Sequence, residues 1–295
     1  MLCAAALAAQ VVSKNYTYAI KGNDTLKFDL YKTSELTDKP LIVFVFGGGF
    51  IKGSRNADFQ IPFFQKLCSN GFNVVSIDYR LGLKNAGQPG ITNTKPLYNA
   101  ISIAAEDLIG AVDYIKKNQA LLNINADKVV CVGSSAGAIT VLQADYFLSI
   151  FPPSKFGLSD SLKFDGVVSF SGAIFSKKGK VKWTGRQPAP TLLLHGTADK
   201  VVPYKQIRLF NQCFSGSDKL ADRFSKFGYP FEIVRFDNKG HEVASMYEGE
   251  FDLIISFIDD FVINKKSCQS DIYIKDLKTS QNKTKNTRKQ LYKNN

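Results

Sequence analysis

A serine between two glycines is the strongest chemical signal in this sequence. Gly133-Ser134-Ser135-Ala136-Gly137 follows the apolar run Val129–Val132 directly and leads into a segment, 136–147, of helix-forming composition. This strand–turn–helix pattern is typical of a nucleophile elbow, in which a tight turn lifts a serine hydroxyl above a sheet at a helix N-terminus. Glycines on either side permit a turn that a Cβ would obstruct. The pattern predicts Ser135 as a nucleophile, and a plain Gly/Ser turn is the alternative.

A serine hydroxyl becomes a good nucleophile when a base takes its proton and an acid orients that base. The chain has two histidines, His195 and His241. Elbows of this kind are followed along the chain first by the acid and then by the histidine. Asp199 comes just after an apolar strand that ends in His195, and only His241 follows it, so we predict Asp199 as the orienting acid and His241 as the base. Asp237 is the alternative acid, and His195 is interpreted as a structural residue at a strand end.

A run of glycines supplies the third element. Gly47-Gly48-Gly49-Phe50 follows the apolar strand 41–46. Acyl transfer develops a negative oxygen, and losing one backbone N–H donor to it typically costs about 2.7–4 kcal/mol. We therefore predict an oxyanion hole from the N–H groups of Gly48, Gly49 and Ala136, with a flexible turn as the alternative for the glycines. This chemistry needs no cofactor and no metal, and none of the five cysteines has the C-x-x-C spacing of a zinc or redox site.

The strands that must position these residues show two different patterns of apolar residues. Residues 15–31 alternate apolar and polar side chains around a Gly-Asn-Asp turn, which predicts an antiparallel hairpin. Later strands at 41–46, 129–132, 167–170 and 191–194 are almost continuously apolar, and 73–77 is nearly so, as in a parallel sheet covered by helices. A last strand is expected at 231–236. Helices are expected between them, at 59–69, 99–118, 136–147, 204–214 and 251–262. The order predicts one α/β domain over residues 15–263, with a mostly parallel, doubly wound sheet and an antiparallel N-terminal hairpin.

The charge of +12 is uneven along the chain. Residues 264–295 hold nine Lys/Arg against Asp271 and Asp276, a net +7, which leaves +5 on residues 1–263. This composition predicts a disordered basic tail with no dedicated partner; adhesion to nucleic acid, an anionic polymer or a membrane surface is the alternative. No aromatic residues interleave with the charges as specific base recognition would require.

The two ends of the chain bear on its location. Met1–Gln10 is apolar with small residues before Gln10, like the end of an export signal, and no apolar run approaches the roughly 18 residues of a membrane span. We expect a secreted or periplasmic protein, with a cytoplasmic one as the alternative. The cysteines do not decide the compartment: Cys131 is expected in the core, and a Cys213–Cys268 disulfide is left open.

Together, the motifs resemble the α/β-hydrolase superfamily, and within it the carboxylesterases with an HGGG-type oxyanion loop, which include acetyl and feruloyl esterases acting on plant polysaccharides. The resemblance spans about residues 38–263 and rests on Gly47–Phe50, Ser76–Arg80, Gly133–Gly137, His195–Asp199 and Gly240–His241. One residue departs from the pattern: Phe46 stands where the family has histidine, so the oxyanion loop must be braced differently. The Asp78-Tyr79-Arg80 segment is expected to be structural.

The resemblance implies a serine esterase that works through an acyl-enzyme. The segment 172–190 is too short for a large helical lid, so an open site is expected, which favours acetyl or cinnamoyl esters of carbohydrates, as small molecules or linked to a polysaccharide. A serine peptidase of the prolyl-oligopeptidase type is a weaker alternative, because no propeller precedes residues 15–263 in this sequence. A hydrolase-fold protein that binds a ligand without turnover is a third, supported only by Phe46. The oligomeric state is left open.

Overall fold

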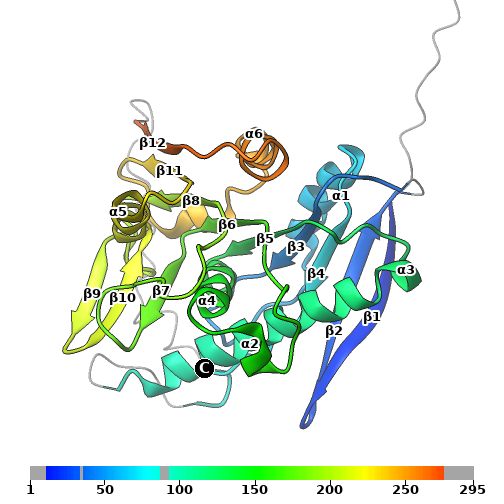
Figure 1. Cartoon of the computed structure of the whole chain (residues 1–295), viewed down its shortest axis with the longest axis horizontal. Coiled ribbons are helices and arrows are strands. Elements are labelled where there is room, and N and C mark those ends of the chain that lie inside the picture. The colour runs from blue at the N-terminus through cyan, green and yellow to red at the C-terminus, as the bar shows by residue number, and fades with distance from the viewer. Residues whose placement is uncertain (1–10, 34–35, 87–92, 276–295) are drawn as a thin grey trace, which may run out of the picture.

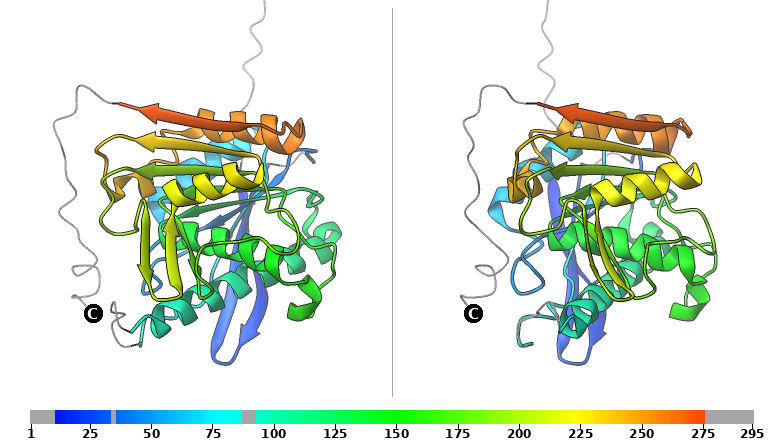
Figure 2. Two further views of the ribbon diagram at one scale, coloured as in Figure 1. Left: turned by 60° about the vertical axis from the view of Figure 1, so that its left-hand side comes forward. Right: turned by 90° about the vertical axis from the view of Figure 1, so that its left-hand side faces the viewer.

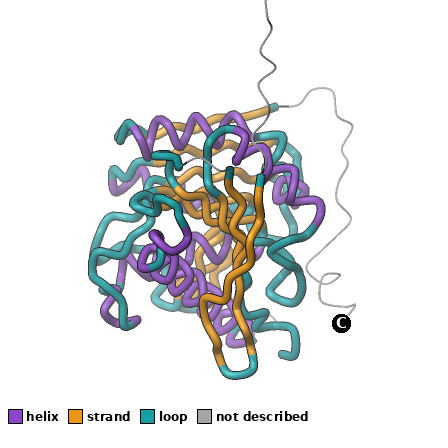
Figure 3. Tube along the Cα trace, turned by 90° about the vertical axis from the view of Figure 1, so that its right-hand side faces the viewer, coloured by secondary structure: helices purple, strands orange, loops and turns teal. Residues whose placement is uncertain are grey.

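The structure is a computed structural model that describes residues 11–33, 36–86 and 93–275 (Figure 1). Its chain begins with the predicted hairpin: β1 (Val12–Lys21) and β2 (Asp24–Lys32) pair antiparallel around Gly22, which has a φ of +61°. The hairpin projects beyond the helices at one end of the sheet (Figure 3). Leu26, Phe28 and Leu30 alternate along one buried face of β2, and from Phe28 to Tyr31 the strand is buried on both faces.

The hairpin begins a nine-stranded sheet of order β1-β2-β4-β3-β5-β6-β8-β11-β12. Strand β2 pairs antiparallel with β4, and every later pairing in this sheet is parallel. The parallel strands are β3 (Leu41–Val45), β4 (Val74–Ile77), β5 (Val129–Ser134), β6 (Gly166–Phe170), β8 (Thr191–Gly196), β11 (Phe231–Phe236) and β12 (Gln269–Ile274). The predicted α/β fold with an antiparallel N-terminal hairpin is confirmed.

Helices cover both faces of this sheet, α1 and α6 on one and α2 and α4 on the other (Figure 1). Helix α4 is buried from Ala136 to Ser149, because it packs between the sheet and α2 and has almost no polar face. The α-helices are α1 (Ile61–Ser69), α2 (Lys95–Lys117), α3 (Gln119–Leu122), α4 (Ala136–Ile150), α5 (Ser217–Phe227) and α6 (Phe251–Phe257). Short 3₁₀ segments lie at Asp58–Gln60, Pro153–Phe156 and His241–Ser245, and a π-helical turn at Ile258–Ile263 follows α6.

The helix predicted at 204–214 is wrong. This segment forms the hairpin of β9 (Gln206–Leu209) and β10 (Gln212–Gly216), and the helix of this region, α5, begins only at Ser217. Strand β10 also pairs with β7 (Ala173–Ser176), so a second, three-stranded sheet of order β7-β10-β9 stands beside the large one, across its strands (Figure 2). Apolar residues three apart imitate a helix here, and pairing with a distant strand overrides that local pattern.

The predicted domain boundary at 263 is also wrong. Strand β12 pairs in parallel with β11 from Phe231↔Gln269 to Phe236↔Ile274, so the sheet continues eleven residues beyond that boundary. An edge strand needs little apolar character, and half of β12 is exposed, which explains why its composition resembles a tail. The rest of the predicted tail, 276–295, and the predicted signal remnant at 1–10 lie outside the described residues.

Candidate functional site

Ser135, His241 and Asp199 meet at the carboxyl edge of the large sheet. Ser135 lies between β5 and α4, Asp199 follows β8, and His241 opens the 3₁₀ turn after β11. Ser135 Oγ lies 2.8 Å from His241 Nε2, and His241 Nδ1 lies 2.8 Å from Asp199 Oδ2. Three residues separated by up to 106 positions therefore form one continuous hydrogen-bonded chain. Parallel strands bring them together because their carboxyl ends share one edge.

The turn at Ser135 is strained and tightly enclosed. Ser135 has φ +52° and ψ −114°, a conformation that residues with a Cβ rarely adopt. A Cβ on Gly133 would lie 2.3 Å from the carbonyl oxygen of Gly137, and one on Gly137 would lie 2.0 Å from that of Val45. Both flanking glycines are therefore required by close backbone packing, which is what the G-x-S-x-G pattern predicts.

A neighbouring hydroxyl ties this turn to the loop that carries His241. Ser134 Oγ donates a 2.6 Å hydrogen bond to the carbonyl of Ala244, which lies in the same 3₁₀ turn as His241. The ring of His241 retains some exposure, with 18% of its side chain accessible, whereas the side chain of Asp199 is fully buried. The base can thus be reached from solvent, while the acid cannot.

Asp199 is held as a carboxylate by donors on both of its oxygens. Its Oδ1 accepts hydrogen bonds from the backbone N–H groups of Val201 (2.8 Å) and Val202 (3.0 Å). Its Oδ2 faces two imidazoles, His241 at 2.8 Å and His195 at 3.3 Å. Burial alone would raise the pKa of Asp199, but the two imidazoles outweigh burial and hold this pKa below its ordinary value. The acid therefore keeps its negative charge in a buried position.

The position of His195 goes beyond the structural role predicted for it. Its side chain is fully buried, its Nδ1 lies 2.8 Å from Ser217 Oγ, and the ring of Tyr204 packs edge-on at 5.5 Å. Its Nε2 reaches Asp199 without the alignment of a full hydrogen bond. Sequence analysis named His195 at this strand end but did not predict its approach to Asp199. The signal was its place four residues before Asp199, with both at the end of one strand.

The glycine loop after β3 lies against the elbow. A Cβ on Gly47 would lie 3.2 Å from the Cβ of Ser135. Gly48 and Gly49 have φ values of +120° and +67°, and a Cβ on Gly48 would lie 1.9 Å from the carbonyl oxygen of Lys52. Within the described segments, no acceptor is found for the N–H groups of Gly48, Gly49 or Ala136. These three N–H groups are the donors that the sequence predicts for an oxyanion hole.

Phe46 is part of an aromatic brace for this loop. Its ring stacks on Tyr79 at 4.6 Å between centroids, and Tyr79 Oη donates a 2.9 Å hydrogen bond to the carbonyl of Phe46. The neighbours of Tyr79 are fixed by ion pairs, Asp78 with Arg55 at 2.7 Å and Arg80 with the buried Asp107 at 2.7 Å. These contacts agree with the structural role predicted for the Asp78-Tyr79-Arg80 segment. They also show what holds the loop in place of the family histidine.

The alternative acid, Asp237, is turned away from the site. Its Oδ1 accepts a 2.7 Å hydrogen bond from Tyr273, and its Oδ2 accepts one of 3.2 Å from the side chain of Asn238. Tyr273 belongs to β12, so the carboxylate of Asp237 is engaged at the edge of the sheet. Of the two aspartates, Asp199 and Asp237, it is Asp199 that contacts His241.

Comparison with solved structures decides the fold family. Esterase 2 of Thermogutta terrifontis, in a structure phosphoramylated by tabun, superposes with a TM-score of 0.60 at 20% identity, over 86% of this chain and 95% of the other. The same esterase with propionate bound gives 0.60, and with butyrate bound 0.59, at the same identity and coverage. The chain has the α/β-hydrolase fold.

Sequence comparisons point the same way over shorter spans. The BD-FAE family model matches residues 28–174 of this chain, which include the glycine loop and Ser135 but neither Asp199 nor His241. Gut esterase 1 of Caenorhabditis briggsae is 30% identical over 123 residues, and that of Caenorhabditis elegans 25% over 122. The chain aligns with 21% of the length of each of these relatives. The named relatives and the solved structures described here are all esterases.

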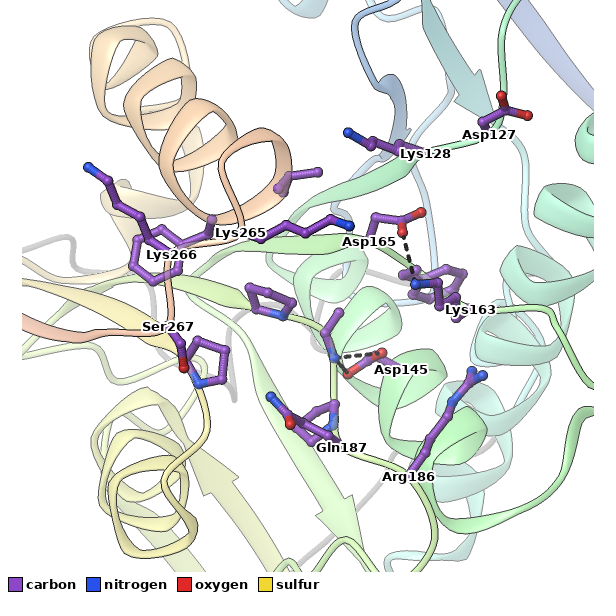
Figure 4. Close-up of a pocket in the computed structure, with 17 residues that line it drawn as sticks. Asp127, Lys128, Asp145, Lys163, Asp165, Arg186, Gln187, Lys265, Lys266 and Ser267 are labelled. Carbon is purple, nitrogen blue, oxygen red and sulfur yellow. Dashed lines mark hydrogen bonds and ion pairs between the residues drawn. The ribbon is translucent and has the colours of Figure 1, made fainter.

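A cavity of about 610 Å³ opens at the opposite, amino edge of the large sheet (Figure 4). The carboxylate of Asp145 on α4 is buried in its wall and accepts a 3.1 Å hydrogen bond from the N–H of Ala189. Burial raises the pKa of Asp145 to about 7, although that hydrogen bond and the charge of Arg186 oppose the rise. Lysines line the cavity, and Lys163 pairs with Asp165 at 3.4 Å. No nucleophile–base pair is found among the side chains lining it, so the elbow is the better candidate site.

Two sequence expectations about the cysteines can be compared with the structure. Cys131 is buried in β5, as predicted, while Cys213 and Cys268 are both free thiols, so the disulfide left open between them is not formed. In the described part of the chain, no three His, Cys, Asp or Glu side chains are arranged to hold a metal ion. Among the same residues, the helices are all too short or too polar to traverse a bilayer.

Proposed function

We propose that this protein is a serine carboxylic-ester hydrolase that works through an acyl-enzyme on Ser135. The observation that carries the proposal is the hydrogen-bonded chain Ser135–His241–Asp199, with both distances at 2.8 Å. Its geometry matches the requirements of nucleophile, base and orienting acid, and it stands beside three unengaged N–H donors. The esterases found by comparison support the same reaction class.

In the first half of the reaction, Ser135 Oγ attacks the carbonyl carbon of the ester while its proton moves to His241 Nε2. The carbonyl oxygen becomes an oxyanion, which accepts hydrogen bonds from the N–H groups of Gly48, Gly49 and Ala136. Asp199 accepts the Nδ1–H of His241, which selects the tautomer whose Nε2 is free and stabilises the imidazolium that forms. His241 then gives its proton to the departing alkoxide, so the alcohol leaves and the acyl group stays on Ser135.

In the second half, water replaces the alcohol. His241 takes a proton from the water, the resulting hydroxide attacks the acyl carbon, and the same three N–H groups bind the second oxyanion. Collapse of this intermediate breaks the bond to Ser135 Oγ, which recovers its proton from His241. The products are a carboxylic acid and the original enzyme.

The proposed substrates are acetyl or cinnamoyl esters of carbohydrates. The match of residues 28–174 to the BD-FAE model supports this class. The structural neighbour is described with propionate and with butyrate bound, which is consistent with a small acyl pocket. Esters with acyl chains of two to four carbons and methyl ferulate are therefore the substrates to compare first, followed by acetylated and feruloylated xylan.

Two adjacent serines make a matched pair of variants to test the proposal. Ser135→Ala removes the nucleophile, and we expect kcat/KM for p-nitrophenyl acetate to fall by about 10⁴-fold or more. Ser134→Ala removes a hydroxyl from the same turn, where its partner is the carbonyl of Ala244, and should keep the activity within about tenfold. The wild type should release a burst of p-nitrophenol equal to the enzyme concentration if deacylation is the slower step.

Covalent labelling gives an independent readout. The structural neighbour has been described as phosphorylated by paraoxon. We expect paraoxon to add one diethyl phosphoryl group to the wild type and to Ser134→Ala, measured by intact mass, and none to Ser135→Ala. Equal turnover or equal labelling in Ser135→Ala would refute the assignment of the nucleophile.

A further inference from the structure

The second sheet and the loop after β7 expose several basic side chains and carry no acidic one. Residues 173–182 and 205–216, here called the basic arm, contain six Lys/Arg and no Asp or Glu. All six side chains are exposed: Lys177, Lys178, Lys180, Lys182, Lys205 and Arg208. In the described part of the chain, none of the six pairs with a carboxylate, whereas lysines elsewhere, such as Lys117, Lys163 and Lys266, do. The arm therefore presents about six uncompensated positive charges to a partner.

The tip of the arm exposes an aromatic ring in an unfavourable backbone conformation. Phe210 lies between β9 and β10 with φ +50°, in the left-handed region where Gly or Asn is usual, and it is 86% exposed. Arg208 Nε donates a 3.2 Å hydrogen bond to the carbonyl of Phe210, which stabilises the turn. Ile207 beside it is also exposed. An exposed phenylalanine gains nothing for folding at such a position, so its ring points to a role outside the fold.

The arm is fixed rigidly to the helix that carries the nucleophile. Gln143 on α4 hydrogen-bonds both backbone groups of Phe175 in β7, accepting from its N–H at 2.9 Å and donating to its carbonyl at 3.2 Å. At the other end, Gly179 donates to the carbonyl of Asn211, which joins the lysine loop to the tip. Gln143 is eight residues after Ser135, about 12 Å along the helix. Whatever binds the arm is thereby held at a set distance from the elbow.

We propose that the basic arm docks this protein onto an anionic lipid surface, with Phe210 inserted among the headgroups. Lysines and arginine pair with acidic headgroups, and an aromatic side chain is favoured at the boundary between headgroups and acyl chains. A hydrated polyanion would match the charges and could stack on the ring of Phe210, but it would gain nothing from the exposed aliphatic side chain of Ile207. The combination favours a lipid surface. The docking does not depend on the proposed hydrolysis.

Co-sedimentation of the full chain with vesicles tests the proposal. We expect binding to vesicles of phosphatidylcholine mixed with phosphatidylserine, and little to phosphatidylcholine alone. Each removed cation should cost about fivefold in partition coefficient, so Lys178→Gln with Lys180→Gln should cost about 25-fold. Phe210→Asn should cost about tenfold, and because Asn tolerates the left-handed conformation better than Phe, this loss cannot come from unfolding of the turn.

A second pair of lysines gives a matched control. Lys14→Gln with Lys21→Gln lowers the net charge equally but acts on the β1–β2 hairpin, at the opposite end of the large sheet. Both double variants keep the basic C-terminal residues, and the control also keeps every cation of the basic arm. The control should therefore bind like the wild type. Phe210→Trp should in addition show a blue shift of fluorescence with the acidic vesicles only.

Three outcomes would overturn the proposal. In the first, both lysine pairs lose binding equally, which would indicate attraction by net charge. In the second, Phe210→Asn binds as the wild type does while the arm lysines matter, which would indicate adhesion to any polyanion. In the third, no variant differs from the wild type. Turnover of p-nitrophenyl acetate, measured on every variant, reports the proposed hydrolysis separately, and Ser135→Ala should bind vesicles normally.

Discussion

Asp199 and Asp145 are both buried carboxylates, and they lie at opposite edges of the same parallel sheet. Two backbone N–H groups and two imidazoles surround Asp199. Among the residues that the structure describes, Asp145 has a single hydrogen-bond donor, the N–H of Ala189, with the guanidinium of Arg186 nearby. The pKa is lowered at Asp199 and raised to about 7 at Asp145. Burial acts in the same direction on both, so the donors around each carboxylate decide which of them is a permanent anion.

The edge of the sheet determines this supply of donors. At the carboxyl edge, the loops that follow β5, β8 and β11 bring backbone N–H groups and side chains to one point. At the amino edge, Asp145 is reached from the middle of α4 and lies against a proline-containing segment, 187–190, in which Pro188 and Pro190 have no N–H to offer. A charged acid can therefore be maintained at the first edge and only poorly at the second.

The largest expected effect is on turnover. Asp199→Asn should lower kcat by about 10⁴-fold, because an amide cannot hold His241 in the tautomer that accepts the proton of Ser135. Asp145→Asn makes the same chemical change at the other edge and should leave kcat within about twofold. Steady-state kinetics on p-nitrophenyl acetate, with thermal melting to confirm folding, gives the comparison. Similar losses in both variants would mean that the two edges are not functionally distinct.

The next effect is on stability. A carboxyl group whose pKa is raised on folding binds its proton more tightly in the native state, so its contribution is complete below the unfolded pKa, near 3.8, and is lost as pH rises to about 7. We expect Asp145→Asn to raise the free energy of unfolding at pH 8 by about 2–4 kcal/mol relative to the wild type and to flatten its decline above pH 4. Urea denaturation at several pH values measures this. A wild type whose stability rises over the same range would contradict the raised pKa.

The smallest effect tests the second imidazole at Asp199. In His195→Asn the new side chain is too short to reach the carboxylate of Asp199. In His195→Gln the side-chain amide can place an N–H near the position of the His195 Nε2. We expect kcat/KM of the Asn variant to fall about tenfold, more at acidic pH because Asp199 protonates more readily, with partial recovery in the Gln variant. The pH dependence of kcat/KM separates this from a structural defect. Parallel profiles in all three proteins would assign His195 to packing alone.

Much of this molecule follows from its sequence. Mainly apolar runs predict β3, β5, β6 and β8, because strands buried on both faces are built mostly from apolar side chains. The glycines around Ser135 predict the elbow, since a Cβ at either place would collide with backbone. The order of the motifs along the chain and the presence of only two histidines led to Asp199 and His241, which the structure places in contact with each other.

Only the tertiary structure decided the remainder. Residues 206–216 form strands because the edge of β7 is free to pair with β10. Strand β12 likewise joins the large sheet by pairing with the edge of β11. Neither segment has the apolar composition of a core strand. The approach of His195 to Asp199 and the lone donor at Asp145 depend on distances between residues that local patterns cannot encode. Sequence periodicity reports which side chains leave water, whereas long-range pairing and the charge state of a buried acid depend on what the folded chain brings beside them.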